Sequence, residues 1–272
     1  MSTVPASLPD LYVLAGGTDT LARAVLGAAE GRGVRALLCS RFEYARVLTV
    51  EVGLSGVRVM PDRPVLVRQH ADGVPPGPDA GFISEEVYAH VKGGLSLLGR
   101  TVVNRPRIRG VSVLQPPAIA QYHLRAAGGL PDRVTLAPEL FRDRVHGGAS
   151  GWEVQDIYTY EASLGGGNTS REAPQRLRRS VSRLFRYVSV LVVGTRTWVS
   201  AGAGDPLAGI AREAAAEIGS IADLQLAEVT FKSTEGEDSL QVARVDANPR
   251  SFAAAPIMSQ AAEALLDLLM AS

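Results

Sequence analysis

The residues best suited to chemistry lie near the C-terminus, in the segment 240–250, which reads Leu-Gln-Val-Ala-Arg-Val-Asp-Ala-Asn-Pro-Arg. Side chains alternate along a strand, so Asp246 and Asn248 are expected on one face while Val245 and Ala247 face a core. Oxygen ligands at the end of a strand suit a hard cation such as magnesium. The same segment would also arise if turn-forming residues merely closed a strand, because Asp, Asn and Pro all favour turns.

Other chemistries find little support in the chain. The four histidines are scattered without metal-binding spacing, and Cys39 is the single cysteine. There is no Gly-x-Ser-x-Gly elbow and no Walker phosphate loop. The turn at 16–19, Gly-Gly-Thr-Asp, lacks the three-glycine spacing of a dinucleotide site. We therefore interpret it as a tight turn.

Composition narrows the class of protein further. The 272 residues carry 28 basic and 28 acidic side chains, so nothing in the charge favours nucleic acid or a membrane surface as partner. No apolar run approaches the ~20 residues of a membrane-spanning helix, and no secretory signal is evident. A cytoplasmic protein is expected.

Strands and helices alternate in the first hundred residues. An apolar run at 11–15, a helical pattern from Leu21 to Ala29 and a second apolar run at 34–39 predict a βαβ unit. Further strands are expected at 57–60, 65–67 and 101–104, with a helix from Ser84 to Leu98.

The elements expected in the rest of the chain would surround the 240–250 segment. A hairpin turning at Gly194 is followed by Asp205-Pro206, which predict a helix start, and by a helical stripe at 207–218. Strands at 224–231 and 240–245 would flank a charged loop at 232–238. Helices are predicted at 116–128, at the arginine-rich segment 174–186 and at 259–270, and strands at 134–137 and 152–160.

Taken in this order, the segments resemble the catalytic core of ATP-grasp ligases, in particular the ribosomal-protein glutamate ligase subgroup and related peptide-modifying ligases. Asp246-Ala-Asn248-Pro249 is similar to the acidic-x-Asn-Pro signature that ends that core. The resemblance implies an α/β fold: an N-terminal Rossmann-like βαβ domain (1–100) and an ATP-grasp-like domain (101–272) with a reduced central lid at about 138–170.

The resemblance also implies roles for individual residues. Asp246, Asn248 and Glu228 would hold magnesium. The hinge residues Gln155, Asp156 and Ile157 would lie against adenine, and Gly166, in a three-glycine cluster, would approach the phosphates. Beyond the resemblance, we hypothesise that Arg183 or Arg186, together with Arg250, supplies catalytic positive charge.

Several positions depart from the family pattern. Lys92 and Lys232 are the only lysines, and neither occupies the place of an ATP-binding lysine. Ser189 stands where a phosphate-binding arginine is expected, and Thr230 stands where the first metal-binding acid is usual. Glu228, two residues before Thr230, lies on the same strand face and would substitute for that acid.

These observations leave alternative functions open. The first is an ATP- and magnesium-dependent carboxylate–amine ligase that acts through an acylphosphate on a small molecule or peptide. The second is a degenerate homologue without catalysis, serving as a binding or partner subunit. The third is an enzyme that reuses the cleft for another ligand. Assembly as a homodimer or with a partner protein is left open.

Overall fold

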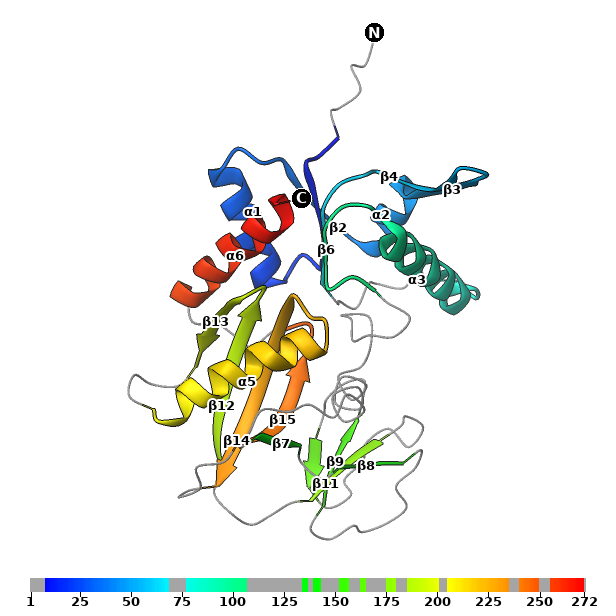
Figure 1. Cartoon of the computed structure of the whole chain (residues 1–272). Coiled ribbons are helices and arrows are strands. Elements are labelled where there is room, and N and C mark those ends of the chain that lie inside the picture. Colours follow the sequence, from blue (N-terminus) through cyan, green and yellow to red (C-terminus); the bar gives the residue numbers. More distant parts are fainter. Residues whose placement is uncertain are drawn as a thin grey trace.

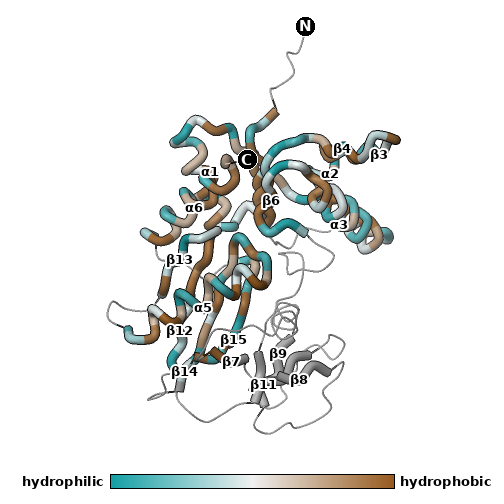
Figure 2. The backbone as a smooth tube through the Cα atoms, viewed as in Figure 1, coloured by the Kyte–Doolittle hydropathy of each residue, from teal (hydrophilic) through white to brown (hydrophobic). Residues whose placement is uncertain are grey.

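The structure is a computed structural model in which the chain forms two α/β lobes (Figure 1). It describes residues 8–68, 77–106, 134–136, 139–142, 152–156, 162–164, 175–179, 185–200, 205–234, 240–249 and 255–271. Hydrophobic residues gather along the inner strands of both lobes (Figure 2). No helix among the described residues is both long and apolar enough to cross a membrane.

The N-terminal lobe is built on a parallel four-stranded sheet with the order β2-β1-β5-β6. Its strands are β1 (Leu11–Leu14), β2 (Ala36–Cys39), β5 (Val65–Val67) and β6 (Val102–Val103), and its helices are α1 (Thr20–Gly31), α2 (Arg41–Val47) and α3 (Ala80–Leu97). The predicted βαβ opening is confirmed. Asp19 begins α1, because its carboxylate accepts a hydrogen bond from the Ala22 amide at 2.8 Å.

A two-stranded hairpin projects from this lobe, away from the rest of the molecule (Figure 1). It consists of β3 (Thr49–Gly53) and β4 (Gly56–Met60), so the strand predicted at 57–60 is confirmed. Val52 and Leu54 at its tip are exposed.

The last helix, α6 (Ala255–Met270), returns to the N-terminal lobe and packs beside α1. Leu265 and Leu269 share a core with residues of α1 and β1. At the rim of this contact, Arg32 forms ion pairs with Glu263 and Asp267. The C-terminal end of the predicted second domain thus packs on the first.

The second lobe contains a five-stranded sheet with the order β13-β12-β14-β15-β7, covered on one face by a helix. The strands are β7 (Val134–Leu136), β12 (Phe185–Val193), β13 (Arg196–Val199), β14 (Leu226–Thr234) and β15 (Leu240–Asp246), and the helix is α5 (Leu207–Ile221). The predicted hairpin at Gly194, which has a positive φ of 57°, is confirmed. The helix start is confirmed as well, since Asp205 accepts from the Leu207 amide at 2.9 Å.

A separate antiparallel sheet with the order β10-β9-β11-β8 lies beside this lobe. Its strands are β8 (Glu139–Arg142), β9 (Trp152–Asp156), β10 (Ala162–Leu164) and β11 (Gln175–Arg179). It includes the segment expected as a lid at about 138–170. The helix predicted over 174–186 is wrong: residues 175–179 pair with both β8 and β9, and Phe185 begins β12. Arginine has a good helix propensity, but pairing on both sides of a strand outweighs such small local preferences.

Candidate metal and nucleotide site

Two carboxylates lie opposite each other in the sheet of the second lobe. Glu228 on β14 and Asp246 at the end of β15 are direct cross-strand partners, and each is only 5% exposed. Side chains of directly opposed residues point to the same face and lie about 5 Å apart at Cβ. Asn248 follows two residues after Asp246 and is also buried. The antiparallel register therefore brings together two of the three residues predicted to hold a metal, and the third follows at the end of β15.

The acids lie on the sheet face that α5 does not cover. Val229 and Val245, their neighbours in the strands, belong to the core that contains the buried residues of α5, as does Ala247. Leu191, the β12 residue opposite Glu228, packs instead with residues of α6. Because neighbouring residues alternate, Glu228 and Asp246 project from the face opposite α5. The prediction that Val245 and Ala247 face the core is confirmed.

Asp246 has two partners that fix its carboxylate. One oxygen accepts a hydrogen bond from the backbone amide of Asn248 at 2.8 Å, which tightens the turn after β15. The other accepts from the guanidinium of Arg244, forming an ion pair. The Arg244 side chain is 33% exposed whereas that of Asp246 is 8% exposed, so Arg244 is the more exposed member of the pair although its Nε is buried.

A polar row crosses the same face one step along the strands. Ser189 on β12 lies opposite Thr230 on β14, and their hydroxyls are hydrogen-bonded at 3.0 Å. Thr230 in turn lies opposite Arg244. Lys232, predicted in a loop, belongs to β14 instead and follows Thr230 on this face. Hydroxyl and cationic groups thus adjoin the two acids.

Asn104 ties this segment to the N-terminal lobe. It follows β6, is 1% exposed and has a φ of 55°. Its amide nitrogen donates to the carbonyls of Leu226 and Ala247 at 2.6 and 2.9 Å, and its oxygen accepts from the amides of Gln225 and Leu226, both at 2.9 Å. The Asn104 side chain, with four hydrogen bonds, therefore holds the start of β14 and Ala247, the residue next to Asp246.

Arg68 makes a second connection between the lobes. It follows β5, and its guanidinium bonds the Asp19 carboxylate at 3.0 Å and the Pro249 carbonyl at 2.6 Å. Its side chain is 1% exposed, so both interactions are shielded from water. Asp19, Arg68 and Asn104 all follow the carboxyl ends of parallel strands, the edge where α/β sheets commonly bind ligands. The segment 246–249 lies against that edge.

Solved structures with a similar fold match nearly the whole length of the chain. The macrocyclase MdnC of Microcystis aeruginosa, bound with precursor peptide MdnA, matches with a TM-score of 0.68 and 13% identity over 96% of this chain and 99% of that one. The ligase PsnB, complexed with minimal precursor, Mg and ADP, matches with a TM-score of 0.63 and 13% identity over 98% and 100%. The chain has the ATP-grasp fold.

A third ATP-grasp structure agrees with these two. It is a RiPP-associated ligase of Chryseobacterium gregarium in complex with ADP and a leader and core peptide, with a TM-score of 0.62 and 11% identity over 95% of each chain. No family model and no curated protein matches the sequence. The resemblance seen in the residues thus extends to the three-dimensional fold.

The residues at the end of β15 suit the magnesium ion that an ATP-grasp site would hold. Carboxylate and amide oxygens are the donors that magnesium prefers, usually one or two carboxylates completed by substrate phosphates. Among the side chains that the structure describes, no group of three or more His, Cys, Asp or Glu is placed to hold a metal. A cation beside Glu228 and Asp246 would therefore depend on Asn248 and on a bound nucleotide to complete its ligands.

The remaining predicted site residues lie elsewhere or outside the described residues. Arg186 forms an ion pair with Asp205 before α5 and projects from the α5 face, so the structure does not bring it together with the acids. Gln155 and Asp156 lie in β9, described by its backbone alone. Ile157, Gly166 and Arg250 lie outside the described residues.

Sequence reasoning missed Arg68, Asn104 and Arg244. Neither Arg68 nor Asn104 lies in a motif that signals its contacts, because its partners are far away in the chain. Arg244 had a signal: it precedes Asp246 by two residues, so strand alternation already placed both on one face.

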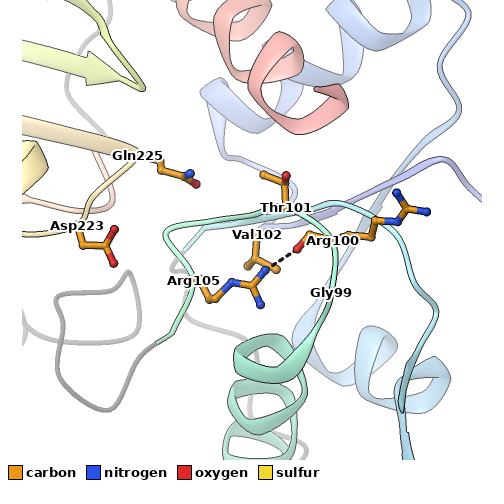
Figure 3. A pocket seen from close by; sticks show the side chains of 7 residues that line it. All are labelled: Gly99, Arg100, Thr101, Val102, Arg105, Asp223 and Gln225. Carbon is orange, nitrogen blue, oxygen red and sulfur yellow. Dashed lines mark hydrogen bonds between the residues drawn. The ribbon is translucent and has the colours of Figure 1, made fainter. Parts of the chain in front are cut away.

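A small polar pocket lies between the lobes, near the start of β14 (Figure 3). Its volume is about 220 Å³, and its lining residues come from the segment that contains β6 (99–102 and Arg105) and from the turn before β14. Arg105 in its wall donates to the carbonyls of Leu95, Leu98 and Arg100, closing the C-terminal end of α3. Its guanidinium is thus engaged in holding the lobe together.

Proposed function

We propose that the protein is an ATP-dependent, magnesium-dependent carboxylate–amine ligase that acts on a peptide. The observation that carries the proposal is the register of β14 and β15, which sets Glu228 opposite Asp246 on the sheet face that α5 does not cover, with Asn248 two residues after Asp246. The peptide substrate is inferred from the peptide complexes of the similar ligases.

The proposed reaction has two steps. An oxygen of a substrate carboxylate attacks the γ-phosphorus of ATP, the bond to the β-phosphate oxygen breaks, and an acylphosphate and ADP result. An amine then attacks the acyl carbon, and inorganic phosphate leaves as the amide forms. Magnesium, when bound, offsets the negative charge that develops on the transferred phosphoryl group.

The chain's own residues prepare the site for this chemistry. Glu228 and Asp246 supply the negative charge that holds the cation, and Asn248 adds a neutral oxygen. Asn104 and Arg68 hold the carbonyls of Ala247 and Pro249, so the acids are positioned by the N-terminal lobe before any ligand binds. Such preorganisation keeps the reacting groups from having to reorder during the reaction.

Binding of ATP tests the proposal without knowledge of the peptide. Calorimetric titration of the wild-type protein with ATP and magnesium should give saturable heat, and the melting temperature should rise with ligand concentration. The isosteric variants Glu228→Gln and Asp246→Asn should lose the magnesium-dependent part of this binding. Glu217→Gln, at an exposed position of α5, is the matched control. Wild-type protein that gives neither heat nor stabilisation with millimolar MgATP would refute the proposal.

A specific observation also favours the second function, a non-catalytic homologue that serves as a binding or partner subunit. Thr230 and Ser189 are hydrogen-bonded to each other where the resemblance implies an acid and an arginine, and Arg244 neutralises one of the two acids. For such a protein, replacing Asp246 and Asn248 by Ala should lower the melting temperature without changing any nucleotide response. For a ligase, the same double change should remove the MgATP response and leave the circular dichroism spectrum unaltered.

A further inference from the structure

We propose that Arg244 couples nucleotide binding to metal binding: its guanidinium serves as the counter-charge of Asp246 without ligand and turns to the nucleotide phosphates when a metal binds. This inference rests on the proposed function. It begins from the ion pair between Arg244 and Asp246, which lies inside the set of residues that would hold the metal.

Without ligand, Arg244 balances the charge of the two acids. Glu228 and Asp246 are direct cross-strand partners, and like charges in that position destabilise a sheet. Both are almost fully buried, so water screens their repulsion poorly. The Arg244 guanidinium on Asp246 offsets this repulsion. It thus performs the electrostatic role that a cation would perform.

A bound cation would compete with Arg244 for Asp246. A metal ion on Asp246 would replace Arg244 as its counter-charge and repel the guanidinium beside it. Arg244 would be the partner that moves, because its side chain is long and one-third exposed, whereas Asp246 is held by the backbone amide of Asn248. A guanidinium is also well matched to phosphate oxygens, to which it bonds through two parallel donors.

Nucleotide phosphates would meet Arg244 beside the hydroxyls of Thr230 and Ser189. Arg244 lies opposite Thr230, whose hydroxyl is bonded to that of Ser189, so this row across the sheet carries two hydroxyls and a guanidinium. A phosphate there would meet one guanidinium and two hydroxyls. Arg244 would thus contribute positive charge on the strand face where Ser189 provides none.

The coupling makes opposite predictions for the two ligands taken singly. In Arg244→Gln, Mn²⁺ without nucleotide should bind about tenfold more tightly, because Asp246 no longer has a competing cation. ATP in EDTA should bind about tenfold more weakly, because a phosphate partner has been removed. The two single-ligand affinities report separately on the contact of Arg244 with Asp246 and on its contact with phosphate.

Two further variants separate charge from structure. Arg244→Lys keeps the charge and should retain metal-free ATP binding to within a few fold of wild type. Asp246→Asn removes the partner of Arg244, so it should bind ATP in EDTA at least as tightly as wild type while losing Mn²⁺. Arg212→Gln, at an exposed position of α5, is the matched control and should leave both affinities unchanged.

The experiment is a set of titrations of folded protein: Mn²⁺ followed by electron paramagnetic resonance without nucleotide, and ATP followed by calorimetry in EDTA. Opposite changes of the two affinities in Arg244→Gln support the proposal. Loss of both affinities, or no change in either, overturns it, and leaves the proposed function intact if wild type still binds MgATP. Wild type that binds no nucleotide under any condition overturns both.

Discussion

Replacing Asn104 should destabilise the protein strongly, since its side chain makes four of the hydrogen bonds that connect the lobes. Asn104→Ala removes four hydrogen bonds at a residue that is 1% exposed. At a net value of about 1 kcal/mol for each bond, the loss is about 4 kcal/mol. The left-handed backbone, with φ at 55°, adds about 1 kcal/mol for a residue with a Cβ and no compensating amide.

Two companion variants divide that total into its parts. Asn104→Gly accepts the left-handed backbone and should cost less than Asn104→Ala by up to about 1 kcal/mol. Asn104→Asp keeps the shape and the acceptor oxygen, but it places a carboxylate against the carbonyls of Leu226 and Ala247, which offer no donor. It should be the most destabilising of the three, because a buried charge is left without a partner.

Urea titrations followed by circular dichroism and by tryptophan fluorescence measure these differences, provided that both signals report one transition. The reasoning is refuted if Asn104→Gly unfolds at the wild-type urea concentration, because the four bonds would then contribute no net stability. It is equally refuted if Asn104→Asp is the mildest change, because the side-chain nitrogen would then not be the donor to both carbonyls.

Three smaller predictions concern the N-terminal lobe. Gly93→Ala, where nothing lies within 4 Å of the new Cβ, should raise the free energy of unfolding by about 0.5–1 kcal/mol. Gly94→Ala would place Cβ 2.6 Å from Leu48 and should lower the free energy of unfolding. Equal effects of the two variants in urea titrations would contradict the packing of α3. Burial raises the pKa of the Cys39 thiol to about 12, so a disulfide reagent at pH 8 should modify it only after unfolding, and rapid labelling of folded protein would disprove this. The arginines that contact Asp267 lower its pKa below the ordinary 3.8, so its ion pairs stabilise the protein above pH 3.8 and are lost as pH falls through the lowered pKa. The difference in melting temperature between wild type and Asp267→Asn should therefore be present at pH 7 and disappear in acid. A difference that persists in acid would contradict the assignment.

Local patterns were enough to predict the elements around the site. Asp205 and Pro206 before an apolar stripe predicted α5, and Gly194 between two apolar runs predicted the hairpin of β12 and β13. Alternation along β15 predicted that Val245 would face the core and Asp246 the other side. These features depend on residues within a few positions of one another, so their chemistry is readable in the chain itself.

Pairing partners decided what local patterns did not. The arginine-rich segment at 175–179 is a strand because β8 and β9 bond to both of its edges, and no property of the segment alone announces those neighbours. The register that sets Glu228 opposite Asp246 also depends on an irregularity between Thr230 and Phe231, which shifts the pairing of the two strands.

The sequence by itself determined which side chains are available to the site and on which strand face each stands: two acids, an amide and an arginine at the ends of β14 and β15. Only the tertiary structure decided that Arg244 bonds Asp246, that Arg68 reaches the Pro249 carbonyl and that Asn104 holds Ala247. The last two contacts join residues more than a hundred positions apart. Such contacts form only when the lobes pack, because a buried polar group takes whichever partner the packed chain brings within hydrogen-bond distance.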